Sequence, residues 1–388
     1  MIYIHIPFCD SFCTYCDFYS EVTGGRSYDG FVSSLCKEIE TEKESIDKEE
    51  NTLYIGGGTP SVLPLSAFCA IGDLLGRDFS EYTVEVNPED IVANGRSYIE
   101  GLTGLGVNRI SMGVQSFDDK MLKWMNRRHD SDTALKAYGI LRDSGVGNIS
   151  IDLIFGIAHL DDGLWRRTVE KAISIKPQHI SAYQLSIEPG SALAGMVRTG
   201  KYTEAEESKC RRQYDILCSM LADAGYRHYE ISNFAIPGYE AMHNSAYWRH
   251  VPYRGFGPGA HSLDVEGGNY IRSWNLPNLG KYVAYYGNSE GCGNEKKNTC
   301  HRYDSIALSD VRQSEVLNSE QIAIEKIMLG LRTDSGVCRD ILDTVSERGR
   351  LETLIGKGML VPVPDNPLFV RIPENCFFIS DNIIADLI

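Results

Sequence analysis

Short apolar runs alternate with amphipathic stretches along the first half of the chain. The apolar runs are rich in β-branched and aromatic residues, which is typical of strands. They cover Ile2–His5, Thr52–Ile55, Tyr82–Val86, Arg109–Gly113, Asn148–Leu153 and His179–Leu185. Each run precedes a polar or glycine-rich turn, so the pattern predicts strands that each lead into a helix.

The stretches between these runs have apolar residues at helical spacing. The first predicted helix carries an apolar stripe of Phe31, Leu35, Ile39 and Ile46. The next helices are predicted at Pro64–Leu75, Asp90–Leu105, Ser131–Ser144 and Gly163–Ile175. Six strand–helix units predict an α/β fold with a parallel sheet, because parallel neighbours need a crossover connection. The periodicity leaves an open sheet and a partial barrel both possible, and in either one the chemistry gathers at the carboxyl ends of the strands.

After residue 185 the rhythm changes. A long helix is predicted over Thr203–Gly225, followed by a glycine- and aromatic-rich stretch to Trp274 and a polar surface excursion over residues 286–314. The last part predicts a small α+β module. Its helices are Gln321–Leu331 and Asp340–Arg348, and its strands are Met359–Val363, Leu368–Ile372 and Phe377–Ile379.

The composition is that of an ordinary globular protein, with 43% hydrophobic and 23% charged residues in 388. The 38 basic and 53 acidic residues give a net charge of -15, which argues against a nucleic-acid-binding protein. We expect a cytoplasmic protein, because the sequence has neither a signal-peptide pattern nor a long apolar run. Eleven cysteines, an odd number, then make a disulfide framework improbable.

Three of the cysteines, Cys9, Cys13 and Cys16, lie together directly after the first strand. Soft thiolates at this spacing select an iron–sulfur cluster, zinc or copper(I). Three reduced cysteines in a loop, or a tetrahedral zinc site with His5 or another residue as the fourth ligand, are the simpler alternatives. The position at the active rim of a parallel sheet favours a cluster, in which three protein ligands would leave one iron open to a small molecule.

Polar or glycine-rich residues also follow the other predicted strands. The second strand leads into Gly56-Gly57-Gly58-Thr59-Pro60, where glycines would let a ligand approach the backbone closely. The later strand ends carry Glu85 and Asn87, Gln115, Asp152, and Tyr183 with Gln184. Each of these residues alone is more often a structural cap or turn, but one shared rim favours a binding site.

The spacing C-x3-C-x2-C after the first strand, with Tyr15 before the third cysteine, resembles the radical S-adenosylmethionine (SAM) superfamily. The resemblance implies a [4Fe-4S] cluster held by Cys9, Cys13 and Cys16, with SAM bound at the open iron. It also implies a partial (β/α)6 radical SAM barrel with a smaller α+β C-terminal domain. We place the barrel domain and an extension at residues 1–262 and the C-terminal domain at 263–388.

Longer phrases, including YIHIPFC, GGGTPS and RISMGVQSF, are similar to the HemN/HemW family, in which two SAM molecules can bind. The resemblance implies that Tyr3, Tyr15, Gly57 and Glu85 contact the SAM on the cluster. It implies that a second SAM is bound by Gly58, Thr59, Gln115, Arg127 and Asp152.

Two departures separate the branches of this family. Phe18 stands where the HemN dehydrogenases have a fourth cysteine, and the chain starts directly at the first strand, whereas HemN has an amino-terminal extension. Both favour the heme-chaperone branch. HNSAYW at residues 243–248 matches a motif of that branch, so the resemblance implies His243 as a heme ligand, with His261 a weaker candidate.

The resemblance thus implies a heme chaperone that binds a [4Fe-4S] cluster, SAM and heme, and delivers heme to recipient hemoproteins, with a homodimer as one possible assembly. Two alternatives remain at this point. One is a radical SAM enzyme acting on a porphyrin, as coproporphyrinogen III oxidases do. The other is a zinc-stabilised binding module without redox chemistry.

Overall fold

The computed structural model describes residues 1–388 except 23, 26, 47–50, 288–305, 348 and 365. The chain divides into two compact units. Unit 1 comprises Met1–Met112, Asn126–Gly147 and Pro252–Val316, and unit 2 comprises Gly113–Met125, Asn148–Val251 and Leu317–Ile388. No helix among the described residues is long and apolar enough to cross a membrane.

Unit 1 is built on parallel strands. β1 (Ile2–Ile6) pairs in parallel with β11 (Arg254–Phe256) on one side and with β4 (Thr52–Gly57) on the other. β5 (Glu81–Val86) joins β4, and β6 (Arg109–Gln115), whose last three residues belong to unit 2, joins β5. Apolar side chains of these strands, such as Ile4, Ile55 and Val84, are fully buried. The predicted parallel sheet is therefore present.

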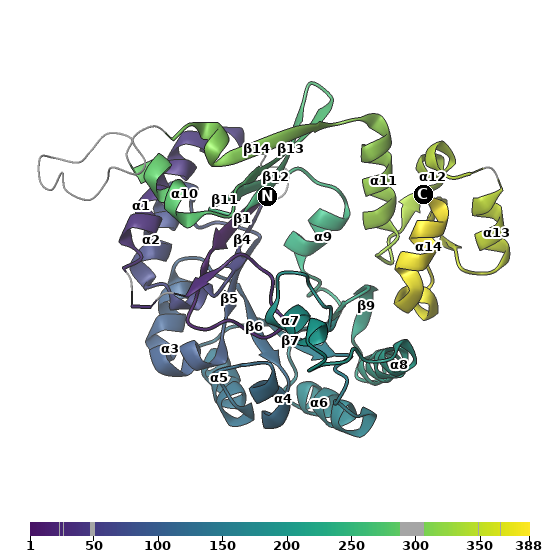
Figure 1. Ribbon diagram of the computed structural model, residues 1–388, viewed down its shortest axis with the longest axis horizontal. Helices are drawn as coiled ribbons and strands as arrows, with labels where there is room; N and C mark the ends of the chain where they lie inside the picture. The colour runs from purple at the N-terminus through teal and green to yellow at the C-terminus, as the bar shows by residue number, and fades with distance from the viewer. Residues whose placement is uncertain (23, 26, 47–50, 288–305, 348, 365) are drawn as a thin grey trace, which may run out of the picture. The chain divides into compact units, whose positions relative to one another are not determined.

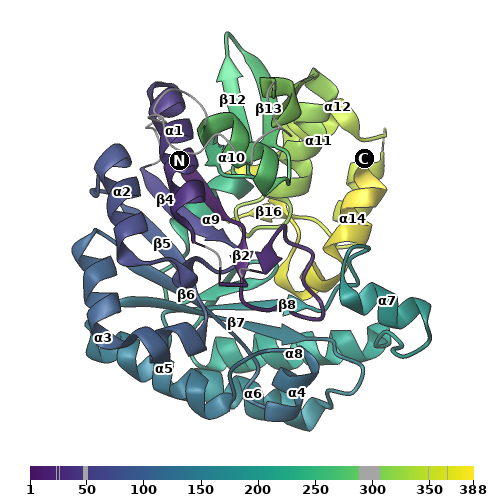
Figure 2. The same cartoon turned by 60° about the vertical axis from the view of Figure 1, so that its left-hand side comes forward.

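The helices of unit 1 cover these strands (Figure 2). They are α1 (Asp29–Glu42), α2 (Leu65–Leu75), α3 (Pro88–Gly104), α5 (Ser131–Asp143) and α10 (Leu279–Gly287). The other strands of the unit are β2 (Phe8–Cys9), β3 (Glu21–Val22), β12 (His261–Glu266), β13 (Asn269–Asn275) and β14 (Arg312–Leu317), the last of which ends one residue into unit 2. Strands and helices alternate along the chain from β1 to β6, which agrees with the predicted α/β class.

Glu38 lies inside unit 1 and is fully buried. Its carboxylate accepts hydrogen bonds from the Gly257 backbone N–H at 2.8 Å, from Asn275 Nδ2 at 2.6 Å and from the Tyr282 hydroxyl at 2.6 Å. The carboxylate thus joins α1 to the segment after β11, to the end of β13 and to α10. A buried carboxylate without such donors would be strongly destabilising.

Unit 2 contains a second group of paired strands. β7 (Asn148–Phe155) and β8 (His179–Gln184) are parallel, while β10 (Asn233–Ala235) is antiparallel to β8 and to β9 (Arg227–Glu230). The helices in this part are α4 (Asp119–Trp124), α6 (Asp162–Ser174), α7 (Ala192–Arg198), α8 (Glu207–Asp223) and α9 (Met242–Trp248). α6 and α8 run along β7 and β8 (Figure 2).

The carboxyl-terminal part of unit 2 is α+β, as predicted. Its sheet has the order β15 (Val337–Cys338), β17 (Asn366–Arg371), β16 (Val361–Val363). Its helices are α11 (Ser319–Gly330), α12 (Arg339–Val345), α13 (Arg350–Gly356) and α14 (Ser380–Leu387), shown in green to yellow in Figure 1. The strand predicted at Phe377–Ile379 is wrong, because Glu374–Ile379 forms a 3₁₀ helix. A run of three apolar residues does not distinguish a strand from a helical turn.

Two other predicted elements differ from the structure. α1 ends at Glu42, and Ile46 follows a short 3₁₀ helix with extended backbone, so it does not extend the apolar stripe. α3 is kinked at Gly95, which has a φ of 71°. Most of the excursion predicted over residues 286–314 lies outside the described residues. The domain boundary at residue 262 stays a prediction.

Glu230, at the end of β9, predicts a pH dependence of stability. Its side chain is fully buried, and burial raises its pKa from 4.5 to about 7. The folded state therefore retains a proton that the unfolded chain releases between pH 4.5 and about 7, so stability falls as the pH rises through this range. One such proton contributes a slope of up to about 1.4 kcal/mol per pH unit.

Glu230→Gln should remove this contribution, which urea unfolding midpoints measured from pH 4.5 to about 7 will test. Glu207→Gln, at an exposed position on α8, is the matched control and should leave the slope unchanged. An unchanged slope in Glu230→Gln would contradict the assignment.

Candidate functional site

The three clustered cysteines lie in the segment after β1. Cys9 ends the short strand β2, which pairs in parallel with β3, and the backbone N–H of Cys16 donates to the Cys13 carbonyl at 3.4 Å. All three thiols are free and half-buried. Burial, followed by the neighbouring sulfurs, raises the pKa of Cys16 to about 11, and burial also raises the pKa of Cys9. Burial thus disfavours the thiolate forms of Cys9 and Cys16, and a positively charged group beside these sulfurs is needed to stabilise them.

The spacing of the sulfurs indicates the size of that group. Among the described residues, one set of His, Cys, Asp or Glu has its ligand atoms all within 4.8 Å of one another, and it does not include these cysteines. Around a single zinc ion the sulfurs would be about 3.8 Å apart. At least one pair of the sulfurs of Cys9, Cys13 and Cys16 is therefore more than 4.8 Å apart, which fits a multi-iron cluster better than a single zinc ion.

His5 does not fit as a fourth metal ligand. Its Nε2 donates to the Tyr19 carbonyl at 2.8 Å, and its Nδ1 accepts from the Tyr3 hydroxyl at 3.0 Å. Both ring nitrogens are thus engaged within unit 1. This weakens the alternative of a zinc-stabilised module with His5 as a ligand.

A chain of hydrogen bonds connects two of the cysteines. The Thr59 hydroxyl lies 3.4 Å from Cys9 Sγ and accepts from Asn87 Nδ2 at 3.2 Å. One terminal nitrogen of the Arg127 guanidinium donates to Asn87 Oδ1 at 2.6 Å, and the other lies 3.4 Å from Cys13 Sγ. The family resemblance assigns Thr59 and Arg127 to SAM binding. In the structure these two residues contact Cys9 and Cys13, two of the candidate cluster ligands.

Arg127 supplies the positive charge at this place. Burial lowers the pKa of the Arg127 guanidinium. The neighbouring groups, with Tyr15 and Cys13 contributing most, raise this pKa by more, so the net shift is upward. Burial also raises the pKa of Tyr15. The charged guanidinium opposes the rise that burial causes in the pKa of the Cys9 thiol, and so favours the thiolate form that a cluster requires.

The residues on either side of Arg127 also hold the cysteine segment. Asn126 has a φ of 59°, and its Nδ2 donates to the Phe12 carbonyl at 2.7 Å. Arg128 donates to Asp10 at 2.6 Å. Asn126 and Arg128 were not assigned a role from the sequence, and Asn87 was named only as a polar residue at a strand end. The one sequence feature that could have pointed to these residues is that they lie close to Arg127 or Glu85 in the chain. Neither the spacing nor the polarity of residues in a sequence indicates contacts between segments more than a hundred residues apart.

The glycine run is required by close packing. A Cβ on Gly58 would lie 2.6 Å from the Phe8 carbonyl oxygen, and Gly57 has a φ of 109° with its Cβ position 2.6 Å from the His5 ring. The backbone N–H of Gly57 donates to Glu85 Oε2 at 3.1 Å, and the Tyr54 hydroxyl donates to Glu85 Oε1 at 2.6 Å. Gly57 and Glu85 are thus brought together, with Tyr54 as a partner that the sequence did not indicate.

Three of the residues that the resemblance assigns to SAM or heme belong to unit 2. Gln115 ends β6 with a φ of 66°, a strained conformation for a residue other than glycine. Asp152 lies in β7 opposite Ser181 of β8. His243 lies on α9, where it is only 2% exposed and its Nε2 lies 3.3 Å from the Tyr247 hydroxyl. The roles of these residues stay predictions.

Arg127→Met tests the electrostatic part of the site. Loss of a buried cation beside Cys13 should make the cluster harder to reduce, and lower its potential by about 60 mV or more, which equals about 1.4 kcal/mol for one electron. A redox titration followed by EPR spectroscopy measures the shift. Arg96→Met removes an exposed arginine paired with Glu100 and should leave the potential unchanged. An unchanged potential in Arg127→Met would contradict this role.

Comparisons with known proteins show the family and the fold of this chain. The profile of the radical SAM superfamily matches residues 3–172. The heme chaperone HemW of Lactococcus lactis is 34% identical over 342 residues, 86% of this chain and 82% of the relative. HemW of Bacillus subtilis is 32% identical over 344 residues, which are 87% of this chain and 84% of the relative.

A solved structure with the same fold is coproporphyrinogen III oxidase HemN from Escherichia coli, which is 18% identical to this chain. It superposes with a TM-score of 0.77 and covers 100% of this chain and 89% of that one, which confirms the predicted radical SAM fold. The chain therefore belongs to the HemW family of the radical SAM superfamily.

Proposed function

We propose that this protein binds heme and delivers it to a recipient hemoprotein. The observation that carries the proposal is the similarity to relatives named heme chaperones, at 34% identity over 86% of the chain for the Lactococcus lactis protein. The exposed Phe18, at the position of the fourth cysteine in the HemN pattern, agrees with it. A cytoplasmic location and a homodimer belong to the same proposal.

Cys9, Cys13 and Cys16 would hold a [4Fe-4S] cluster in this proposal, and SAM would be bound beside it. When bound, cluster and SAM supply reductive radical chemistry, or serve as a structural and regulatory group. The protein's own residues orient the cofactors: Tyr3, Tyr15, Gly57 and Glu85 at the first SAM, and Gly58, Thr59, Gln115, Arg127 and Asp152 at the second. The contacts of Thr59 with Cys9 and of Arg127 with Cys13 support positions close to the cluster.

His243 is the proposed heme ligand. An imidazole can ligate heme iron, and Tyr247 and Trp248 beside it offer flat apolar surface. Because His243 is 2% exposed and hydrogen-bonded to Tyr247, heme binding requires a local rearrangement that exposes the imidazole and breaks this hydrogen bond. Heme binding should therefore be slow compared with encounter at an open pocket.

His243→Ala should weaken heme retention by at least about tenfold, because an iron ligand is lost. Heme titration of cluster-loaded protein followed by absorbance, with and without SAM, measures this. His159→Ala, at an exposed histidine of the same unit, is the control and should bind heme normally. Iron content should be unchanged in both variants. Normal heme binding by His243→Ala would refute the assignment, and a loss in His261→Ala instead would move the ligand to His261.

The alternative function is a radical SAM enzyme that acts on a porphyrin. The fold shared with the Escherichia coli oxidase favours keeping this candidate. Anaerobic incubation with SAM, dithionite and coproporphyrinogen III separates the two. The chaperone proposal expects no protoporphyrinogen, and its formation would show that the protein is an oxidase.

A further inference from the structure

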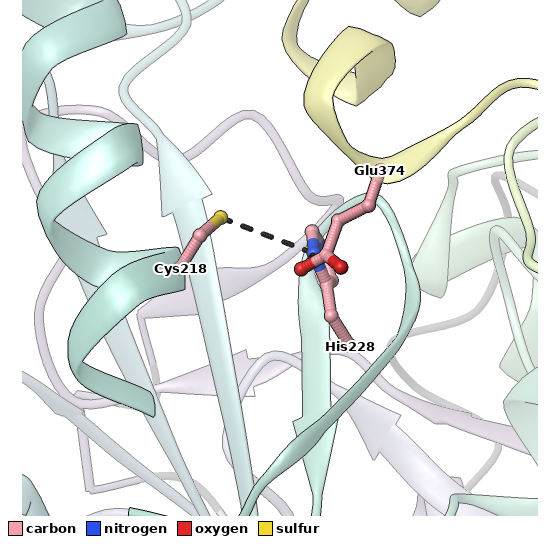
Figure 3. Close-up of side chains that lie close together, drawn as sticks. All are labelled: Cys218, His228 and Glu374. Carbon is pink, nitrogen blue, oxygen red and sulfur yellow. Dashed lines mark hydrogen bonds and ion pairs between the residues drawn. The ribbon is translucent and has the colours of Figure 1, made fainter. Parts of the chain in front are cut away.

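Cys218, His228 and Glu374 form a side-chain cluster in unit 2, apart from the cysteines of unit 1. They come from three segments: Cys218 from α8, His228 from β9 and Glu374 from the start of the 3₁₀ helix Glu374–Ile379. His228 Nδ1 lies 3.9 Å from Cys218 Sγ and 3.0 Å from Glu374 Oε1, and all three ligand atoms lie within 4.8 Å of one another (Figure 3).

The hydrogen bonds of Tyr214 favour a proton on Nε2 of the His228 imidazole. The Tyr214 hydroxyl donates its proton to the Ile231 carbonyl at 2.9 Å. Its oxygen lies 3.3 Å from His228 Nε2 and therefore accepts the Nε2 proton. The neutral ring then has its lone pair on Nδ1, the nitrogen that faces Cys218 and Glu374. Metal-bound histidines are commonly oriented in this way by an acceptor at the other ring nitrogen.

An Nδ1 lone pair and a carboxylate oxygen 3.0 Å apart repel each other unless a positive charge lies between them. A proton supplies this charge when the ring is an imidazolium. A metal ion would supply it as well and would add the sulfur as a ligand. Around tetrahedral zinc, neighbouring nitrogen, oxygen and sulfur ligands are about 3.3 to 3.8 Å apart, close to the separations observed here.

The surroundings hold the ligands in place and leave one side open. The His228 ring stacks on Phe234 at 4.0 Å and meets the edge of Phe377 at 5.0 Å, and its side chain is only 3% exposed. The Glu374 side chain is 56% exposed. An ion would enter from the side of Glu374, where water can complete its coordination.

We propose that Cys218, His228 and Glu374 bind one divalent transition-metal ion of the zinc type, with water as the fourth ligand. Binding replaces the thiol proton of Cys218 and, when the His228 ring is an imidazolium, the proton between imidazole and carboxylate. The displaced protons leave to solvent. The ion links α8 and β9 to the carboxyl-terminal α+β part through Glu374. The site does not depend on the proposed heme function, because none of its residues contributes to the cysteine cluster or to α9.

An activated thiol is the competing interpretation of a cysteine beside a histidine and a glutamate. Burial raises the pKa of Cys218 to about 12, which is opposite to the shift that a nucleophilic cysteine shows. The geometry also places the sulfur at 3.9 Å from Nδ1, longer than a nucleophile–base hydrogen bond.

Zinc binding by the full-length, cluster-loaded protein tests the proposal. The protein is dialysed anaerobically against low micromolar zinc, and zinc and iron are then measured by mass spectrometry. We expect about one zinc per chain in addition to the iron. Zinc-edge X-ray absorption, which does not detect the iron cluster, should show one sulfur at about 2.3 Å with nitrogen and oxygen at about 2.0 Å.

Cys218→Ser and His228→Gln should lose the bound zinc, and Glu374→Gln should weaken zinc binding by about tenfold. Cys376→Ser, two residues from Glu374, is the control and should bind zinc normally. Iron content reports whether the variants fold, and Glu374→Gln changes an exposed side chain, so it provides the test even if the two buried substitutions prevent folding. Any of three results would overturn the proposal. The unmodified protein could bind no zinc, Glu374→Gln could bind as much zinc as the unmodified protein, or the zinc-edge spectrum could show three sulfur ligands, as expected for zinc bound to Cys9, Cys13 and Cys16.

Discussion

Replacing Cys13 with alanine should remove the iron–sulfur cluster from the protein while the chain still folds. Three cysteines supply all the protein ligands of the proposed cluster, and two thiolates do not hold a four-iron group. Cys13 is also the sulfur beside the Arg127 guanidinium, 3.4 Å away, so its loss leaves a buried cation without this partner. Iron should fall by about tenfold or more in protein reconstituted under argon, with loss of the brown colour.

Cys36→Ala is the matched control for this experiment. Cys36 is a half-buried free cysteine on α1, outside the segment that contains Cys9 and Cys16. This variant should retain its iron and its EPR signal after reduction. If Cys13→Ala kept full iron, the cluster would have other ligands, and the proposed cofactor site would fail with it.

Replacing Glu38 with leucine should cost the fold about 3–5 kcal/mol of stability. The leucine leaves four donors without this acceptor: the Gly257 N–H, the Asn275 amide and the hydroxyls of Tyr282 and Tyr286. Each of these donors is buried, so water does not replace the lost carboxylate. The urea midpoint of cluster-free protein, followed by tryptophan fluorescence, measures the loss.

Two further variants separate the lost hydrogen bonds from other effects. Glu38→Gln keeps the shape and one acceptor oxygen, so its loss should be smaller than that of leucine. Glu40→Leu changes a side chain that is 49% exposed on the same helix, and should shift stability by less than about 0.5 kcal/mol. Equal stability of Glu38→Leu and the unmodified protein would show that this carboxylate is not needed for the fold.

Burial also gives Glu38 a pH dependence with a definite sign. Desolvation raises its pKa above 4.5, although its hydrogen-bond donors oppose the shift. A raised folded-state pKa means that stability from this group is full below pH 4.5 and falls as the pH rises through the folded-state pKa. Glu38 and Glu230 therefore act in the same direction, one in each unit.

The candidate site shows where sequence reasoning succeeds. Cys9, Cys13 and Cys16 are separated by few residues, so their proximity follows from chain length alone. Gly57 and Gly58 were identified because glycines at a strand end allow close approach of a ligand. In the structure it is the protein itself, Phe8 and the His5 ring, that approaches their Cβ positions, and the approach of a ligand stays a prediction. Local spacing and residue chemistry carry such inferences without a structure.

Other parts of the site depend on contacts between distant segments. Asn87 bridges Thr59 and Arg127, and Asn126 and Arg128 hold the cysteine segment across more than a hundred residues. The Cys218, His228 and Glu374 cluster joins three elements in the same way. No periodicity or motif indicates such pairings, because they arise from packing of the elements.

The sequence by itself determined the strand–helix order, the clustering of Cys9, Cys13 and Cys16 and the family, since these rest on local periodicity and short motifs. The tertiary structure alone decided that Glu38 is a buried acceptor, that Arg127 lies against Cys13, and that His243 is enclosed. Burial and long-range hydrogen bonding depend on how the elements pack, and packing sums many weak contacts that no single stretch of chain encodes.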